Sequence, residues 1–452
     1  MSGSEVPFRR EVTEQLRLIV HLLRWVALGA VVGVLAGLSS AAFLQTLSWA
    51  TALRVEHVWM LFALPGAGLV IGLAYHYLGG RSDGGNSLII DEIHAPAAWV
   101  PRRMAPLVFV GTVVTHLFGG SAGREGTAIQ MSGSLTDAFS RLVHLKPENR
   151  RLMLIAALAG GFGAVFGVPI AGCVFGLEVQ AVGRMRYDAL VPALSASLVG
   201  DLVVRAVGVK HMSLPQLAEI HLTAGLALKV AIAGLAFGLA SIAFTELTHG
   251  IKRAFGSIVT WPPARPMIAG VAVIGLVALV GNRDYLGLSL PLITKATAGG
   301  AGIVGGAFAL KLLFTAVTLG AGFPGGEVTP LFVIGATLGV TMGRLLGVPV
   351  PLMAAIGFVA VFAGAANTPL ACTVMGVELF GGSGVVLFAI ACVVSYIFSS
   401  HRGIYGAQRI DSPKGPSSLI NGQHPAMTLN QFAVRRRNSS PTPTDHPTAE
   451  EP

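Results

Sequence analysis

Residues 169–178 read PIAGCVFGLE, and residues 369–378 read PLACTVMGVE. Proline, alanine, valine, glycine and glutamate coincide in the two segments, which begin 200 residues apart. A second pair lies upstream, where residues 120–127 read GSAGREGT and residues 322–329 read GFPGGEVT. Both fit G-x-x-G-x-E-x-T, at a spacing of 202 residues. Two motifs that recur in the same order at nearly the same spacing indicate an internal repeat rather than generic glycine-rich sequence.

The composition around this repeat is typical of a membrane protein. Of 452 residues, 53% are hydrophobic and 12% are charged, and the mean hydropathy is +0.70. Soluble domains carry about 25% charged residues. Long stretches contain no Asp, Glu, Lys or Arg, among them 25–53, 58–80, 152–177, 345–377 and 379–400. Several are long enough to cross a bilayer, and uninterrupted apolar runs favour helices over a barrel. The sequence therefore predicts an all-α polytopic membrane protein.

The charge distribution and the cysteine positions argue against a nucleic-acid-binding protein and against a disulfide-stabilised protein. The net charge of +9 would suit nucleic acid, but the cations lie in loops and tails between apolar runs, which membrane topology explains better. The three cysteines, Cys173, Cys372 and Cys392, lie in apolar segments and are expected to pack rather than form disulfides. We expect no cofactor, no metal site and no nucleic-acid partner.

The chain divides into three parts. Residues 1–20 are expected to form a cytoplasmic N-terminal segment, because arginines accumulate there. Residues 21–410 are expected to form the transport domain, with repeat halves at about 21–210 and 211–410. Residues 411–452 are rich in Pro, Ser, Thr and Asn and are expected to be a disordered cytoplasmic tail without a regulatory domain. Both termini are thus placed on the cytoplasmic side.

The repeat itself points to transport. Secondary transporters are commonly built from repeats of opposite orientation, whose broken helices meet near the midplane of the membrane. Helix N-termini then face one point, where free N–H groups and partial positive charge suit an anion. We therefore expect two halves whose broken helices meet at a midplane anion site.

Glu125 is the first candidate functional residue. It lies between glycines in Gly123-Arg124-Glu125-Gly126-Thr127, after an apolar run. A carboxylate within the membrane costs about 2.5–3.5 kcal/mol on insertion scales, so its presence suggests a function. At a helix N-terminus it occupies the place of an anion when ionised and can leave when protonated. The alternative is a glutamate that only complements the helix dipole.

Two further segments carry candidate anion ligands. In residues 325–330 (GGEVTP), two glycines precede a helix start, so the N–H groups of Glu327 and Val328 and the hydroxyl of Thr329 are available donors. A plain helix cap is the alternative there. Residues 84–90 (GGNSLII) predict a glycine turn with Asn86 or Ser87 as N-cap, and from spacing alone capping is favoured over anion binding.

These motifs together resemble the CLC family of chloride channels and proton-coupled anion antiporters. Residues 123–127 resemble its GREGP motif, residues 325–330 its GxFxP segment, and residues 84–90 stand in the place of GSGIP. The resemblance covers about residues 20–410. It implies a CLC-type fold, a homodimer, and Glu125 as the gating and proton-transfer glutamate. It also implies these anion ligands: Asn86, Gly123, Arg124, Gly126, Glu327, Val328, Thr329 and Tyr405.

Departures from the common CLC motifs resemble the fluoride-exporting branch. Thr127 replaces a proline, Asn86 replaces a serine, and Glu327-Val328-Thr329 replaces the x-Phe-x run. Val179 stands where chloride antiporters usually keep a glutamate for internal proton transfer. The sequence therefore does not identify the residues that carry protons on the intracellular side. For Tyr405, the resemblance implies a pore tyrosine at the intracellular end; the alternative is an ordinary membrane-interface tyrosine.

The sequence thus predicts a secondary active fluoride/proton antiporter that exports fluoride through the cell (inner) membrane. A chloride/proton antiporter or chloride channel of the same family is the first alternative. An intramembrane enzyme using Glu125 and Glu327 is the second, but no nucleophile–base pair or metal-ligand cluster accompanies them. The exchange stoichiometry, the rate and the role of the tail do not follow from sequence.

Overall fold

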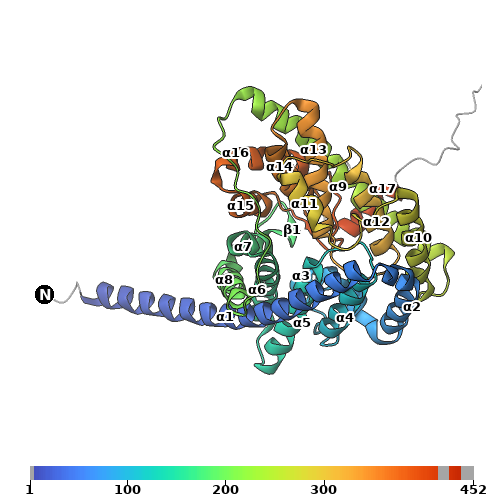
Figure 1. Cartoon of the computed structure of the whole chain (residues 1–452). Helices are drawn as coiled ribbons and strands as arrows, with labels where there is room; N and C mark the ends of the chain where they lie inside the picture. The colour runs from blue at the N-terminus through green and yellow to red at the C-terminus, as the bar shows by residue number, and fades with distance from the viewer. Residues whose placement is uncertain (1–4, 416–426, 439–452) are drawn as a thin grey trace, which may run out of the picture.

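The fold is that of a computed structural model, which describes residues 5–415 and 427–438. The described chain is mostly helical, and Figure 1 shows its helices packed around one another. It also contains three strands of two residues each. In chain order the elements are α1 (Glu5–Glu56), η1 (Val58–Ala63), α2 (Leu64–Ala74), η2 (Tyr75–Gly79), η3 (Gly80–Gly84), α3 (Gly85–His94), α4 (Met104–Leu117), α5 (Glu125–Leu142), α6 (Pro147–Phe166), α7 (Pro169–Glu178), β1 (Ala181–Val182), η4 (Tyr187–Ala189), α8 (Leu190–Ala206), α9 (Ala224–Ile258), α10 (Ala264–Val280), α11 (Leu290–Thr297), α12 (Ala307–Gly320), α13 (Val328–Leu346), α14 (Val350–Ala366), α15 (Pro369–Phe380), η5 (Gly382–Gly384), α16 (Val385–Phe398), β2 (Arg409–Ile410), β3 (Met427–Thr428) and α17 (Leu429–Asn438).

Long apolar helices and short broken ones occur together. By length and composition, five helical segments of the described chain are able to cross a membrane: Glu14–Glu56, Val58–His94, Tyr187–Ala206, Ala224–Ile258 and Val328–Leu346. Shorter apolar helices such as α7 and α15 are too short to cross alone, since a span takes about 20 residues. Non-helical backbone at membrane depth is tolerated only where protein or water surrounds it. The chain is a multi-pass helical membrane protein, as the sequence predicts.

The repeat is visible in the order of helices. α4 and α12 have 14 residues each, and α12 begins 203 residues after α4. α13 likewise begins 203 residues after α5, and α15 begins 200 residues after α7. In Figure 1 the blue-to-green elements of the first half and the orange elements of the second half lie on opposite sides of a central region. The division expected near residue 210 lies in the segment that joins α8 to α9.

Short breaks at equivalent places interrupt both halves. α6 is capped at its C-terminus by Gly167, whose φ of 74° lies in the left-handed region, and α7 begins two residues after this cap, at Pro169. α14 is capped by Asn367, with a φ of 61°, and α15 begins two residues after that cap, at Pro369. A left-handed residue ends a helix and a proline at the first position starts the next. The two breaks thus follow from the glycine or asparagine and the prolines of the repeated motif.

Small residues set the packing of α1 against α8. Gly29, Gly33 and Gly37 lie four residues apart along α1, on the face toward α8. A Cβ at Gly33 would lie 2.7 Å from the carbonyl oxygen of Ala196, so no larger residue fits there without displacing the backbone. Close approach through small residues is the usual basis of helix association in membranes.

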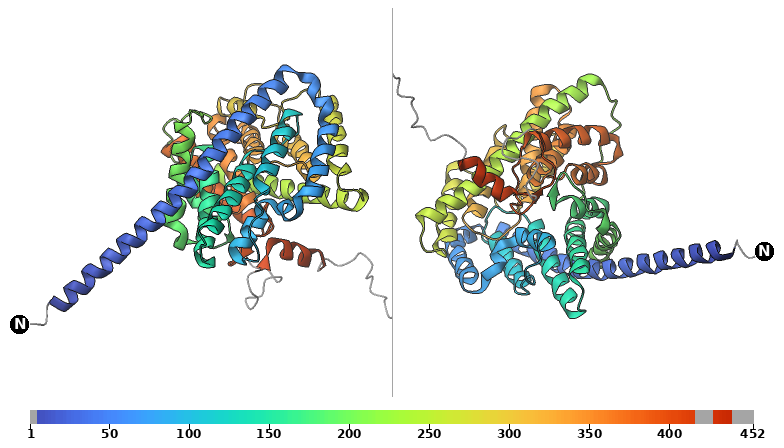
Figure 2. Two further views of the ribbon diagram at one scale, coloured as in Figure 1. Left: turned by 90° about the horizontal axis from the view of Figure 1, so that it is seen from below. Right: turned by 180° about the vertical axis from the view of Figure 1, so that it is seen from behind.

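The structure describes parts of the segments expected at the two ends of the chain. α1 runs without a break from Glu5 past residue 20 to Glu56, and its N-terminal part projects from the body in Figure 2. Residues 427–438 are not disordered, because β3 pairs with β2 and α17 packs beside it. Figure 2 shows α17 as the red helix on the outside of the body. Residues 416–426 and 439–452 lie outside the described part.

Candidate functional site

Two glycine loops meet at the centre of the molecule. The N–H of Gly123 donates to the carbonyl oxygen of Gly326 at 2.6 Å, and the N–H of Gly326 donates to the carbonyl oxygen of Gly123 at 2.9 Å. This isolated antiparallel bridge joins the loops that lead into α5 and α13. The N-termini of these two helices, one from each half, therefore converge on one place.

Gly326 allows three backbone nitrogens to converge. A Cβ at Gly326 would lie 2.8 Å from the nitrogen of Gly126, 3.1 Å from that of Glu125 and 3.3 Å from that of Arg124. Any side chain at position 326 would therefore fill the space in front of these N–H groups. The first N–H groups of a helix have no partner within the helix and carry partial positive charge. The loop thus presents the α5 N-terminus to an acceptor.

The carboxylate of Glu125 is seated at the N-terminus of the opposite helix. Its Oε2 accepts hydrogen bonds from the Thr329 N–H at 3.0 Å and from the Arg124 N–H at 3.1 Å. Its Oε1 accepts a short hydrogen bond from the Thr329 hydroxyl and lies 3.5 Å from Nε of Arg124. Glu125 is fully buried. The Glu125 carboxylate thus accepts hydrogen bonds from donors that could equally bind a small free anion.

Glu327 does not mirror Glu125, although the two occupy the same place in the repeated motif. Glu125 is the first residue of α5, whereas Glu327 is the N-cap of α13, whose first residue is Val328. The side chain of Glu327 caps no N–H and is only half-buried. Its Oε2 lies 3.7 Å from the point where a Cβ of Gly126 would stand. Glu327 therefore borders the same space without occupying the α13 N-terminus.

Asn86 lies next to the α5 N-terminus, but not as a cap. α3 begins at Gly85 with Gly84 as N-cap, and no side chain caps the helix, so the expectation of Asn86 or Ser87 as N-cap is wrong. The Asn86 side-chain nitrogen would lie 3.0 Å from a Cβ at Gly126. Its side-chain oxygen is buried and finds no hydrogen-bond partner within the described residues. The amide is therefore held beside the site with unused hydrogen-bonding capacity.

Tyr405 reaches the site from the loop after α16. The residue is 2% exposed, and its ring meets the edge of Phe175 at a centroid distance of 6.5 Å. Its hydroxyl has no hydrogen-bond partner in the part of the chain that the structure describes. The carboxylates of Glu125 and Glu327 both lie within electrostatic range of it. An unpaired donor so placed is available to an anion.

Two cavities lead from the surface toward Thr329. An open cleft of about 1350 Å³ is lined in part by Arg124, Met212 and Leu290. The same three residues, together with Thr329 and Phe332, line a small cavity of about 20 Å³. A single water needs about 10–15 Å³, so the inner cavity holds one group of that size. The wide cleft and the small cavity beside Thr329 therefore adjoin the same three residues.

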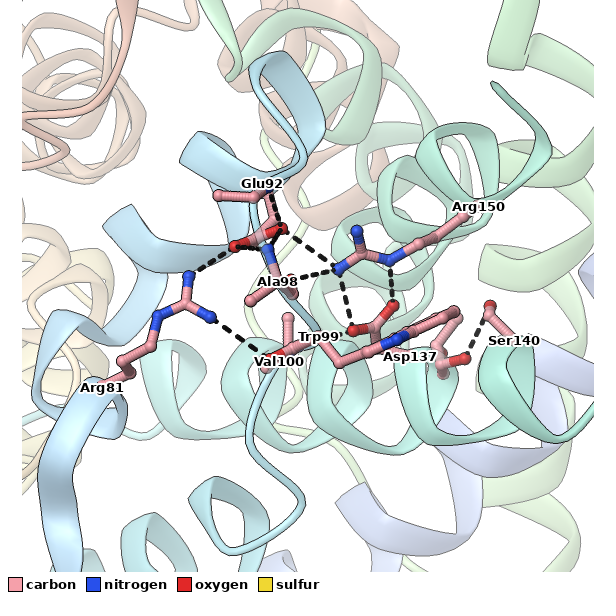
Figure 3. Close-up of polar contacts among 10 residues, drawn as sticks. Arg81, Glu92, Ala98, Trp99, Val100, Asp137, Ser140 and Arg150 are labelled. Carbon is pink, nitrogen blue, oxygen red and sulfur yellow. Dashed lines mark hydrogen bonds and ion pairs between the residues drawn. The ribbon is translucent and has the colours of Figure 1, made fainter. Parts of the chain in front are cut away.

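A buried ionic network holds α3 against α5. In Figure 3, Arg150 of α6 lies between two buried carboxylates: Nε and Nη2 donate to Asp137 at 2.6 and 3.0 Å, and Nη2 also reaches Glu92 at 3.2 Å. Arg81 donates to the other oxygen of Glu92 at 2.5 Å, and Trp99 stacks against Arg150 at 4.7 Å. Asn86 and Glu125 belong to the two helices that this network joins.

Neither this network nor the buried Lys311 was predicted from the sequence. Lys311 of α12 is fully buried, and its Nζ donates to the Ser121 and Ser289 hydroxyls at 2.9 Å each and to the Gly287 carbonyl at 2.7 Å. Ser121 belongs to the loop that leads to Glu125 at the start of α5. A charged residue inside an apolar run was the available signal for Lys311, as it was for Glu125.

The family comparison covers most of the chain. A family model described as "Voltage gated chloride channel" matches residues 67–400. A chloride/fluoride channel protein of Pseudomonas syringae pv. tomato is 47% identical over 422 residues, which is 92% of each chain.

Solved structures of CLC proteins are also similar to this chain. The crystal structure of a CLC-type fluoride/proton antiporter superimposes with a TM-score of 0.83 at 34% identity, covering 86% of this chain and 98% of that one. A slow cyanobacterial Cl−/H+ antiporter matches with a TM-score of 0.70 at 18% identity, over 84% of this chain and 93% of that one, which bears on the fold alone.

Proposed function

This chain belongs to the voltage-gated chloride channel (CLC) family, and from that premise we propose that it is a fluoride/proton antiporter that exports fluoride from the cell. The observation that carries the proposal is the position of Glu125. Its carboxylate lies on the Thr329 N–H and hydroxyl at the N-terminus of α13. A negative side chain and a free anion compete for such donors, so the charge of Glu125 governs whether the anion binds.

The competition couples protons to the anion. When Glu125 accepts a proton, it loses the charge that holds it on the α13 N-terminus, and the donors become free for fluoride. When it releases the proton, the carboxylate returns and expels the anion. Each turn then moves a proton and fluoride in opposite directions through the same place. The Nε of Arg124 lies 3.5 Å from Oε1 of the same carboxylate.

The donors of the site suit a small, strongly hydrated anion. Fluoride gives up its water only to strong hydrogen-bond donors. The candidate hydrogen-bond donors to fluoride are the backbone N–H groups of Gly126 and Val328, the Thr329 hydroxyl, the Asn86 amide and the Tyr405 hydroxyl. The cavity of about 20 Å³ beside Thr329 also favours a small ion. Similarity to proteins named for fluoride supports the same choice over chloride.

The family and the composition support a proposal for the cellular location and the oligomeric state. We place the chain in the inner membrane of a bacterial cell, in contact with lipid, with both termini in the cytoplasm. We further propose a homodimer in which each subunit has its own pathway. Because Val179 stands where the family's chloride antiporters usually carry a glutamate, the inner proton route runs elsewhere. Glu327 borders the site and is the nearest remaining carboxylate among those named here.

Efflux from proteoliposomes tests the proposal. Vesicles loaded with fluoride or chloride are diluted, and ion electrodes and a pH probe follow both species. We expect fluoride efflux far faster than chloride efflux, with protons driven the opposite way. Glu125→Gln should abolish the proton movement, and Glu148→Gln, an exposed glutamate in α6, should not. Equal or faster chloride efflux would reassign the substrate, and proton coupling retained in Glu125→Gln would refute the gate.

A further inference from the structure

A cleft lies outside the anion pathway, where the C-terminal segment packs on the body. It has a volume of about 40 Å³ and lies between α9, the loop at 401–406 and α17. We call it the tail cleft and define it by its charged lining: Glu246, Arg253, Arg402, Arg436 and Arg437. None of these residues belongs to the site around Glu125.

Two arginines of the tail cleft, Arg253 and Arg437, make no ion pair within the described residues. Its lining in the described chain holds four arginines and the single carboxylate of Glu246. Arg402 donates to Glu246 at 2.8 Å, and Arg436 donates to the same oxygen. No carboxylate pairs with Arg253 or Arg437 in the described residues. Guanidinium groups in a concave site concentrate positive potential, so the tail cleft attracts an anion.

The tail cleft is assembled by contacts that need no ligand. The N–H of Leu429 donates to the Gln408 carbonyl at 3.0 Å, and the N–H of Asn430 donates to the Gly406 carbonyl at 3.0 Å. The ring of Phe432 lies 5.0 Å from that of His401, and Leu429 and Phe432 are each 4% exposed. α17 is therefore anchored by its apolar side chains, while Arg436 and Arg437 line the tail cleft.

We propose that the tail cleft binds a phosphate group. Arginine presents planar pairs of N–H donors that match phosphate oxygens and remain charged at any physiological pH. With about 10–15 Å³ needed per water-sized group, the volume of about 40 Å³ holds roughly three such groups, so most of the four oxygens of a phosphate fit inside the tail cleft. The ligand is either the headgroup of an anionic phospholipid or a soluble phosphate. The family match ends at residue 400, so α17 lies outside it.

Hydrogen exchange of the full-length protein tests the proposal. Exchange at residues 429–438 is measured in detergent with increasing inorganic phosphate, and in vesicles of phosphatidylcholine with or without phosphatidylglycerol. We expect slower exchange with inorganic phosphate if the ligand is soluble, or only with phosphatidylglycerol if it is a lipid headgroup. Arg253→Gln and Arg437→Gln should each weaken the effective probe about tenfold.

Arg435→Gln is the matched control. Arg435 is exposed on the same helix and does not line the tail cleft, but its loss changes the net charge by the same amount. Arg435→Gln should therefore keep the probe's affinity within about twofold. Equal weakening by Arg435→Gln and Arg437→Gln would show diffuse attraction instead of a site. Unchanged exchange with both probes would overturn the proposal. Neither result depends on which ion the protein transports.

Discussion

Glu178 and Glu378 cap each other's helices. The carboxylate of Glu178, the last residue of α7, accepts the N–H groups of Leu370 and Ala371 at 3.1 and 2.8 Å. The carboxylate of Glu378, in α15, accepts the N–H groups of Ile170 and Ala171 at 3.0 and 2.7 Å. The sequence motif that predicts the repeat is thus also the contact that joins its halves, with each glutamate on the N-terminus of the other half's helix.

This reciprocity predicts equivalent losses of stability. Glu178→Ala and Glu378→Ala each leave two N–H groups without an acceptor, and loss of a cap costs about 0.5–2 kcal/mol. We expect both variants to lower the melting temperature in detergent by a similar amount, while Glu219→Ala, an exposed position, leaves it unchanged. A loss confined to one of the two variants would contradict the equivalence of the two caps.

Thr329 is expected to determine how tightly the site holds fluoride. Thr329→Val removes the hydroxyl but keeps the N–H and the shape of the side chain. Hydrogen bonds to charged groups contribute about 1.5–3 kcal/mol, so the fluoride concentration for half-maximal transport should rise about tenfold or more. Thr329→Ser should restore most of the affinity. Transport by Thr329→Val indistinguishable from the natural protein would remove Thr329 from the pathway.

Asn86 is expected to act in selectivity. Its amide is buried beside Gly126, with an oxygen that has no partner in the described chain, and it caps nothing. Asn86→Ser shortens the side chain, withdraws the N–H donors and enlarges the space. We expect a lower ratio of fluoride to chloride efflux in vesicles. If the ratio stayed constant, Asn86 would be a packing residue.

The repeated motifs were sufficient to predict that two helix N-termini, one from each half, meet. They placed Glu125 and Thr329 at facing helix ends, because a repeat with breaks at matching positions brings those ends together. The motif spacing of 202 suggested that Glu125 and Glu327 are equivalent, whereas the helices themselves are offset by 203. One residue of difference changes Glu327 from a helical residue to an N-cap. Spacing within a glycine-rich loop does not fix where a helix begins.

Contacts between distant segments were not predictable from the sequence. Glu92, Asp137 and Arg150 stand in separate helices, and nothing in their spacing links them. The same holds for Lys311 and Ser121. Asn86 was misjudged because a polar residue after glycines is most often a cap. α17 was misjudged because its composition is that of a disordered tail, while its order comes from Leu429 and Phe432 packing on the body.

The network around Arg150 is expected to be the most sensitive to mutation. Arg150→Met leaves Asp137 without its arginine and Glu92 with only Arg81. Breaking a buried ion pair from one side costs about 3–5 kcal/mol. We expect a large fall in melting temperature and loss of transport, since α3 and α5 carry Asn86 and Glu125. Arg151→Met, at the neighbouring position outside the network, should have a small effect.

Gln408 is expected to hold Tyr405 at the inner end of the site. Its fully buried side chain donates to the carbonyls of Val179 and Ala366, at 2.7 and 2.8 Å. Gln408→Leu leaves these two carbonyls unpaired, at about 1–3 kcal/mol each. We expect faster hydrogen exchange at residues 401–410 and fluoride leakage that is not coupled to protons, because the loop no longer fixes Tyr405. Gln15→Leu, at an exposed position of α1, should change neither. Faster exchange without leakage would separate the loop's order from gating, and unchanged exchange in a folded variant would refute the role of Gln408.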